Sequence, residues 1–372
     1  MVLELISASS RREALEIWRT LETKISIQRL TNSSTWTETW LNHFGNHVPH
    51  QFIVARRGVS PCGIALVTQA VDQRNGPLRF QSWHLGTSGE PDADSICVEH
   101  NTLLVRPEDR VEFQHLLWEW AAAKSDWDEF RLDGFQADEI ADWIASDDRW
   151  SVVAKPARYF DLNAARETNR QTLEVLGPHT RSSIRRSVRR AGDIRFEWAE
   201  TVQEAESIFA ELIELHQIRW NSVGMPGSYA SHTFREFHYE LLNRLVPLGQ
   251  MGLFRVRNDR VTIGCDQVLI DQNRACIYQG GRVLPHDHRI STGVIVDYCL
   301  IEECRRRGFD AVDFLAGDSP HKRRLSTHSL PLVWASYRRP STAHRLIDGL
   351  RYLKRFLQKS FRNPDALMPD AK

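Results

Sequence analysis

The chain has 372 residues, and its 48 Lys and Arg residues balance 48 Asp and Glu residues, so the formal net charge at pH 7 is zero. A hydrophobic content of 41% with 26% charged residues is ordinary for a globular protein, and the length predicts two domains or one large one. No apolar run approaches the roughly 20 residues that cross a bilayer, so we expect no integral membrane segment.

Charge is distributed unevenly along the chain. Residues 1–160 contain 16 Lys and Arg against 23 Asp and Glu, whereas residues 161–372 contain 32 against 25. We therefore expect an anionic ligand on the second half. The six cysteines show no C-x-x-C spacing, which favours buried free thiols over a zinc site or a disulfide framework. The N-terminal segment carries charges where a signal peptide has its apolar core, which favours a cytoplasmic protein.

The first 165 residues alternate strand and helix signals in the order of an α+β unit. Turn-bounded β-prone runs predict strands at 2–6, 51–56, 63–70, 78–85, 128–134 and 150–162. Amphipathic segments predict helices from Ser9 or Ser10 through Leu21, at 34–44, at 111–124 and at 137–146. A similar order recurs later, which predicts an α+β protein of two domains, residues 1–165 and 166–372.

The second half is expected to open with a connector over residues 163–180, broken at Gly177-Pro178. The elements expected after it are helices at 181–190, 202–220 and 232–245, a hairpin of strands 252–257 and 261–270, and a strand at 275–279. Loop 221–229 contains Gly224, Pro226 and Gly227, and it is suited to covering a cleft.

The segment 181–190, RSSIRRSVRR, has five arginines and no acid. On a helix these arginines cover about half of the circumference, and Ile184 and Val188 lie on the other half. One interpretation is a guanidinium face for a phosphate-rich partner. The other is a solvated face that pairs with acidic groups of the first domain.

A strand–loop–helix–strand unit follows at residues 274–325. Gly280-Gly281 is expected to close the strand 275–279, and Ser291-Thr292-Gly293 to open an apolar helix that Gly308 terminates. A buried strand at 311–315 and a turn at 316–318 come next. The free N–H groups at the helix start predict an anion site, with phosphate as the natural ligand, although Ser and Thr also serve as ordinary helix caps.

This unit resembles a known family. Ser291-x-Gly293, Gly308-Phe309-Asp310 and Asp313-Phe-x-x-Gly-Asp-x-x-x-Lys-Arg-Arg324 are similar to the acetyltransferase (GNAT-type) domain of CelD-like proteins, which are associated with bacterial cellulose or exopolysaccharide formation. The resemblance extends to a basic helix, to Leu-His-x-x-Arg-Trp at 215–220, and to segments of the first half. This chain has Thr292 where the family usually has Pro, and His321 where it has Tyr.

The resemblance implies tandem GNAT-like domains with mixed, mostly antiparallel central sheets. It also implies an acyl-CoA donor, here acetyl-CoA, whose pyrophosphate lies at residues 289–293. The donor-binding candidates are therefore Arg289, Ser291, Thr292 and Gly293. No metal is expected.

Acyl transfer from a thioester needs a base for the nucleophile and an acid for the leaving thiolate. Tyr278 is the candidate acid by residue type, Asp318 or His288 is the candidate base, and Asp313 lies at the same strand end. The side chains proposed to line the acceptor pocket are His216, Arg219, Asp266 and Lys322. The structural alternatives are that Asp313 only bonds backbone, His288 is loop surface, His216 is a satisfied structural histidine and Lys322 belongs to a surface charge run. The acceptor is an unknown amine or hydroxyl, and a sugar precursor of a polysaccharide fits the resemblance.

Two other functions stay open. Tandem GNAT domains with basic helices also resemble FemAB-type aminoacyltransferases, which use aminoacyl-tRNA, and segment 181–190 would then contact RNA. The departures at Thr292 and His321 motivate a non-catalytic scaffold. The basic amphipathic segment 343–361 is expected to dock on the second domain or to contact a membrane surface, and no DNA partner is expected.

Overall fold

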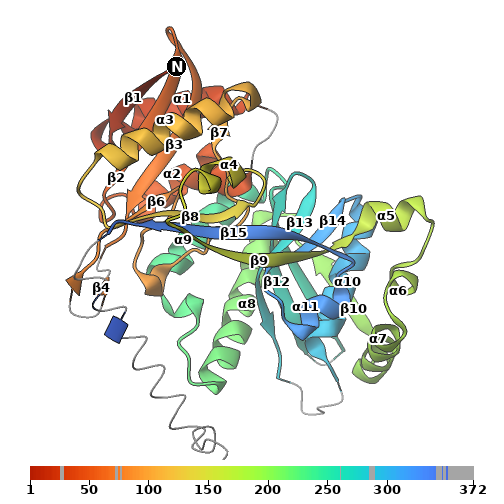
Figure 1. Cartoon of the computed structure of the whole chain (residues 1–372). Coiled ribbons are helices and arrows are strands. Elements are labelled where there is room, and N and C mark those ends of the chain that lie inside the picture. Colours follow the sequence, from red (N-terminus) through yellow and green to blue (C-terminus); the bar gives the residue numbers. More distant parts are fainter. Residues whose placement is uncertain are drawn as a thin grey trace, which may run out of the picture.

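A 13-stranded mixed sheet runs through the whole molecule (Figure 1). The computed structural model describes residues 1–25, 29–71, 74–75, 78–259, 261–284, 290–340, 346 and 349–350. The strands, in their order across the sheet, are β1 (Val2–Ser7), β2 (His50–Arg57), β3 (Ser60–Gln69), β6 (Ser82–Leu85), β8 (Glu129–Gln136), β15 (His328–Arg338), β9 (Trp150–Asp161), β14 (Ala311–Ala316), β13 (Arg274–Arg282), β12 (Thr262–Asp271), β11 (Met251–Asn258) and β10 (Ile194–Trp198). Strand β7 (Leu104–Val105) pairs with β3, and β4 (Arg74–Asn75) and β5 (Leu78–Arg79) form a small separate hairpin.

The sheet has two halves with the same pattern of strand directions. From β1 to β15 the pairings are three antiparallel, one parallel and one antiparallel, and the series from β10 to β9 repeats this order. Each half ends in a strand that the other half of the chain supplies. Strand β15 pairs with β8, β9 pairs with β14, and β9 and β15 join the halves as an antiparallel pair. The division near residue 165 stays a prediction, since β9 lies among the strands of the second half.

Helices cover both faces of the sheet because successive strand residues point to opposite sides. Phe52, Ile64, Leu253 and Leu269 belong to a core packed under α1, α2, α8 and α9 that continues across both halves. Their sequence neighbours pack into two other cores, under α3 and α4 in the first half and under α10 in the second. The helices are α1 (Arg11–Glu22), α2 (Ser34–His43), α3 (Arg110–Ala123), α4 (Ala141–Ala145), α5 (Leu162–Glu167), α6 (Thr172–Val175), α7 (Pro178–Ala191), α8 (Val202–Ser222), α9 (His232–Leu245), α10 (Thr292–Arg307) and α11 (Pro320–Leu325).

The two halves are tied together by contacts between distant parts of the chain. Trp36 of α2 packs edge-on against Phe237 of α9, with ring centroids 5.3 Å apart. Arg29 donates to the carboxylate of Asp271 at 3.1 Å, and both side chains are about nine-tenths buried.

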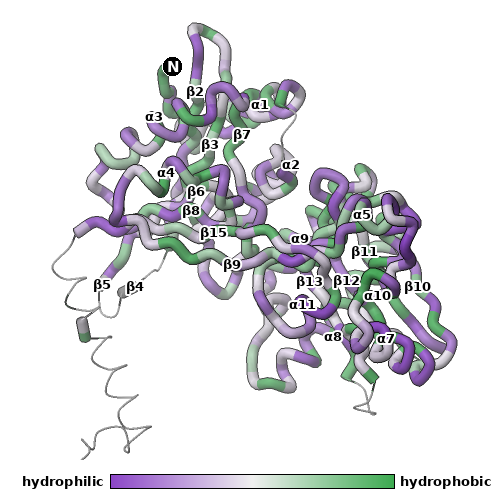
Figure 2. Tube along the Cα trace, turned by 45° about the vertical axis from the view of Figure 1, so that its right-hand side comes forward, coloured by the Kyte–Doolittle hydropathy of each residue, from purple (hydrophilic) through white to green (hydrophobic). Residues whose placement is uncertain are grey.

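Hydrophobic segments lie along the strands in Figure 2, and hydrophilic segments lie on the outer turns.

The structure corrects two expectations of local structure. Strand β13 continues through Gly280 and Gly281 to Arg282, because these glycines allow a close approach and do not end the strand. A Cβ on Gly281 would lie 2.7 Å from the Leu212 carbonyl oxygen of α8. The expected connector at 163–180 contains the short helices α5 and α6 and the start of α7. Helices α7, α8, α9 and α10 are confirmed, and Gly308 caps α10 with φ 83°.

Segment 343–361 lies almost wholly outside the described residues, as do His288 and Arg289. Within the described residues, no helix combines the length and the apolar character that crossing a membrane requires.

Candidate functional site

Strands β13 and β14 diverge soon after they begin. Their parallel pairing is limited to residues 274–276 with 311–313. Beyond that point β14 follows β9 through a register irregularity between Asp313 and Ala316, where Leu315 adopts φ 60°. Helix α10 starts beside the far end of β13, because the Thr292 hydroxyl donates to the Val283 carbonyl oxygen at 3.2 Å. The far end of β13 therefore lies beside the N-terminus of α10.

Among the described residues, no side chain caps the N-terminus of α10. Ser291 is the N-cap residue, but its hydroxyl makes no cap hydrogen bond, whereas Thr201, Ser231 and Ser319 cap α8, α9 and α11. No described residue accepts from the backbone N–H groups of residues 292–294. Helix-start N–H groups of this kind, together with the positive end of the helix dipole, suit an anion.

A network of charged side chains connects strand β12 to this end of α10. Asp266 of β12 contacts Arg282 at 2.7 Å, and Arg282 contacts Asp297 of α10 at 2.9 Å. Asp297 in turn contacts Nε2 of His321 at 2.5 Å. The His321 ring lies over the first turn of α10, since a Cβ on Gly293 would be 3.4 Å from its Cε1 atom.

The two carboxylates of this network differ in their proton affinity. Burial raises the pKa of Asp266 to about 6, and the neighbouring charge of Asp297 acts in the same direction against the attraction of Arg282. Burial also acts to raise the pKa of Asp297, but the hydrogen bond from His321 and the charge of Arg282 hold it below its usual range. Asp297 is therefore the ionised partner of His321, and it fixes the orientation of that ring.

Helix α7, which carries the arginine face, packs against α10 through its buried side near the same helix end. Ser291 donates its backbone N–H to the Ser187 hydroxyl of α7 at 3.4 Å, and helices α7 and α10 pack together. Arg185, Arg186 and Arg189 are exposed, and none of them has an acidic partner within the residues that the structure describes. Of the two interpretations of segment 181–190, the ion pairs with the first domain find no support at these three positions.

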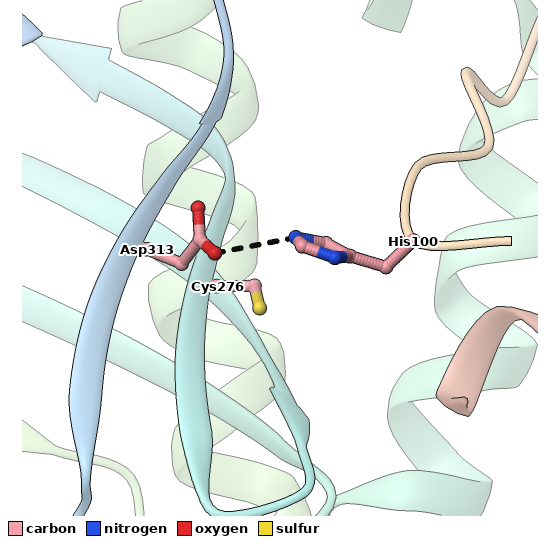
Figure 3. Close-up of side chains that lie close together, drawn as sticks. All are labelled: His100, Cys276 and Asp313. Carbon is pink, nitrogen blue, oxygen red and sulfur yellow. Dashed lines mark ion pairs between the residues drawn. The ribbon is translucent and has the colours of Figure 1, made fainter. Parts of the chain in front are cut away.

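Tyr278 and Asp313 lie on the opposite face of the sheet, at the seam between the halves. The Tyr278 hydroxyl donates to the Ile96 carbonyl oxygen, and burial raises its pKa well above the usual value. Asp313 accepts from Arg274 at 2.9 Å and lies 3.2 Å from Nε2 of His100 (Figure 3). Burial opposes ionisation of Asp313, but His100 and Arg274 hold its pKa below the usual range.

Asp318 and Lys322 lie at the end of β14 and point in different directions. The Asp318 carboxylate is about half exposed and is held by Arg158 and Arg323, both at 2.6 Å. The Lys322 ammonium turns inward and donates to the carbonyl oxygens of Leu315 at 3.1 Å and Ala316 at 2.6 Å. Burial lowers the pKa of Lys322, against the attraction of nearby carboxylates on both faces of the sheet.

The remaining acceptor candidates lie elsewhere on the second half. His216 is buried, its Nδ1 atom lies 3.1 Å from Oε1 of Gln217, and its ring packs edge-on against Tyr229. Burial lowers the pKa of His216. Arg219 is exposed on α8. The structure thus places Thr292 and Gly293 at the start of α10, where His321 joins the network that includes Asp266, with Lys322 nearby, and leaves Asp318, His216 and Arg219 outside.

The sequence reasoning missed Arg282, Asp297 and His100. Asp297 had one local signal, because it is an acid inside the apolar run 294–301, where a charged group needs a partner. Arg282 and His100 had none, since their partners lie 15 or more residues away.

Comparisons with known proteins agree with this fold. Residues 178–323, somewhat less than half of the chain, match the family model described as an acetyltransferase (GNAT) domain. No curated protein matches the sequence. Among solved structures, FemX superposes with a TM-score of 0.57 and 11% identity over 93% of this chain and 100% of that one.

Two further structures are similar over most of their length. A DUF2156 domain from Agrobacterium fabrum has a TM-score of 0.54 and 12% identity over 91% of this chain and 95% of that one. L-PGS from Bacillus licheniformis has a TM-score of 0.50 and 8% identity over the same shares. At such identities these likenesses concern the fold alone. The predicted α+β fold with a mixed, mostly antiparallel sheet is confirmed, the GNAT match covers residues 178–323, and the CelD-like resemblance stays a prediction.

Proposed function

We propose that the protein transfers an acyl group from acyl-CoA, such as acetyl-CoA, to an amine or hydroxyl acceptor, with a sugar precursor as one candidate. The observation that carries the proposal is the start of α10, where Ser291 makes no cap hydrogen bond, α7 with its exposed arginines packs alongside, and His321 lies over the first turn. Backbone N–H groups at a helix start bind phosphate oxygens, and guanidinium groups add charge for the other phosphates of the donor. The GNAT match over residues 178–323 supports the same donor class.

The residues around this helix end suit the proton steps of acyl transfer. The acceptor attacks the thioester carbon, the carbon–sulfur bond breaks, and the acceptor proton must leave. We assign proton removal to His321, because Asp297 holds its Nε2 side and its Nδ1 atom has no hydrogen-bond partner among the described residues. The Lys322 ammonium uses two of its three N–H donors on backbone carbonyls, which leaves one for the developing oxyanion.

The earlier candidates fit these roles less well. Asp318 is ion-paired to two arginines that hold its pKa low, which weakens it as a base. The Tyr278 hydroxyl is engaged by a backbone carbonyl and lies on the other face of the sheet, so it needs a rearrangement to protonate a thiolate. His288 and Arg289 remain candidates that lie outside the described residues.

Titration calorimetry with acetyl-CoA and longer acyl-CoAs tests the donor. The charge reversal Arg185→Glu should weaken binding at least tenfold, whereas Arg12→Glu, an exposed helix arginine on the first half, should not change it. His321→Gln should leave donor affinity nearly unchanged and lower turnover by about 10²–10⁴-fold. The absence of binding to every acyl-CoA tested by the folded protein would remove the proposal. Binding without release of CoA, when a panel of amino sugars is offered, would favour the scaffold.

The same arginine face supports a second candidate, an aminoacyl-tRNA donor of the FemAB type. Three exposed arginines without acidic partners in the described structure fit a phosphate backbone as well as they fit CoA. Filter binding to tRNA should then weaken steeply with salt, and Arg185→Glu should reduce the salt slope by about one. Failure to retain tRNA at low salt would end this version and leave acyl-CoA standing.

A further inference from the structure

The seam between the two halves holds a buried His–Cys–Asp cluster (Figure 3). His100 comes from the loop before β7, Cys276 from β13 and Asp313 from β14. One nitrogen, sulfur or oxygen atom from each residue lies within 4.8 Å of the others, and the side chain of Asp313 is entirely buried. The cluster is separate from the network at α10, because alternation along the strands places it on the other face of the sheet.

His100 is held in this position without a hydrogen bond to satisfy it. It is only 4% exposed, and neither ring nitrogen has a hydrogen-bond partner within the described part of the chain, since the 3.2 Å contact with Asp313 lacks hydrogen-bond geometry. Its backbone is at φ 54°, in the left-handed region that non-glycine residues rarely adopt. In Figure 3 the ring points at Asp313 and Cys276. A buried ring that faces Asp313 and Cys276 without a hydrogen bond, on a strained backbone, is an arrangement suited to a metal ligand.

The surroundings of the cluster suit a metal ion. The carboxylate of Asp313 is fixed by Arg274 on Oδ2 and by the Leu315 N–H on Oδ1, and each oxygen keeps a second lone pair. Ligating carboxylates are commonly oriented by such outer hydrogen bonds. A cavity of about 20 Å³ adjoins His100 and Cys276, which is room for one water molecule as a fourth ligand.

We propose that His100, Cys276 and Asp313 bind one divalent ion of the zinc class at the seam between the halves. One imidazole, one thiolate and one carboxylate are ligands that Zn²⁺ accepts, with a water in the fourth position. Binding converts the Cys276 thiol to a thiolate and releases one proton to solvent, so affinity rises with pH. The ion links a loop of the first half to two strands of the second, and it gives this cluster a clamping role outside acyl transfer.

Cobalt titration of the metal-free full chain tests the site, because Co²⁺ bound to a thiolate absorbs in the near ultraviolet. One equivalent should produce this band, Zn²⁺ should displace it, and added Zn²⁺ should raise the unfolding temperature. Cys276→Ser should abolish the band and His100→Ala should weaken binding at least tenfold. Cys265→Ser is the matched control, since Cys265 is equally buried on β12 outside the cluster.

No near-ultraviolet band at stoichiometric Co²⁺, or a band that persists in Cys276→Ser, would overturn the proposal. Should Cys276→Ser fail to fold, alkylation of the wild-type protein under mild denaturant decides the matter. Zn²⁺ must then slow modification of Cys276 more than that of Cys265, and equal rates at Cys276 with and without Zn²⁺ would refute the site. These readouts do not depend on acyl-CoA, so the two proposals succeed or fail separately.

Discussion

Arg282 offers the strongest test of the electrostatic reasoning, because one guanidinium serves two buried carboxylates. Asp266 has no exposed surface and Asp297 is 4% exposed, and both lie within 2.9 Å of Arg282. Arg282→Met removes the cation and leaves both carboxylates in place. Breaking a buried ion pair from one side costs about 3–5 kcal/mol, because the remaining charge stays without compensation. Total stabilities of about 5–15 kcal/mol make such a loss easy to measure.

The effect should depend on pH in a defined direction. Burial already raises the pKa of Asp266 from 3.8 to about 6, so its ionisation opposes folding increasingly as the pH rises from about 4 to 6. Without Arg282 the carboxylate is harder still to ionise, which extends the upper end of this window to higher pH while its lower end stays near the unfolded pKa. The free-energy loss in Arg282→Met should therefore be smaller at pH 5 than at pH 8. Asp266→Asn in the Arg282→Met background should recover part of the loss at pH 8.

Urea unfolding at both pH values, monitored by tryptophan fluorescence, measures these differences directly. Arg255→Met is the matched control, because Arg255 also bridges two carboxylates, those of Glu197 and Glu211, but their side chains are 46% and 33% exposed. Exposed pairs contribute about 0–1 kcal/mol, so the control should lose far less. A loss in Arg282→Met below about 1 kcal/mol, or an equal loss at pH 5 and pH 8, would refute the network as described.

Two further predictions concern other sites. Burial opposes the ionisation of Asp133, but His84 and Arg131 hold its pKa at about 2. The ionised carboxylate therefore stabilises the fold above pH 4, and this contribution is lost as the pH falls toward 2. Asp133→Asn should cost about 2 kcal/mol at pH 7, and the difference from wild type should close in acid, as acid-unfolding curves would reveal. Gly252→Ala places a Cβ 1.9 Å from the Trp198 ring, and thermal unfolding should record a loss of about 1–3 kcal/mol. An unchanged midpoint would show that the ring moves aside freely.

Local signals predicted most elements of this fold. Helix α9 was expected at 232–245 and has those bounds, since Ser231 caps it and its apolar residues recur at helical spacing. Glycine was the ambiguous residue. Gly308 ends α10 in the left-handed conformation, but Gly281 stays in its strand and allows α8 to approach. Spacing alone does not distinguish a glycine that ends an element from one that permits close packing.

Only the part of the site that depends on local signals was predicted from the sequence. Thr292 and Gly293 could be found because a helix start carries a local signature. The partnership of His321 with Asp297 could not, because it depends on how α11 packs against α10. The seam cluster is still less local, since His100 and Asp313 lie more than 200 residues apart in the chain. The participation of Asp318, His216 and Arg219 in the reaction stays a prediction.

The exchange of β9 and β15 between the halves has a consequence for synthesis on the ribosome. Strand β8 ends at Gln136, but its partner β15 starts only at His328. At about 5–20 residues per second, roughly 10–40 s of translation separate the two strands. During that interval the edge of β8 has no partner and is open to mispairing with another nascent chain. We expect the emerging polypeptide to need shielding until its last strand arrives, and a chain truncated before residue 328 to aggregate.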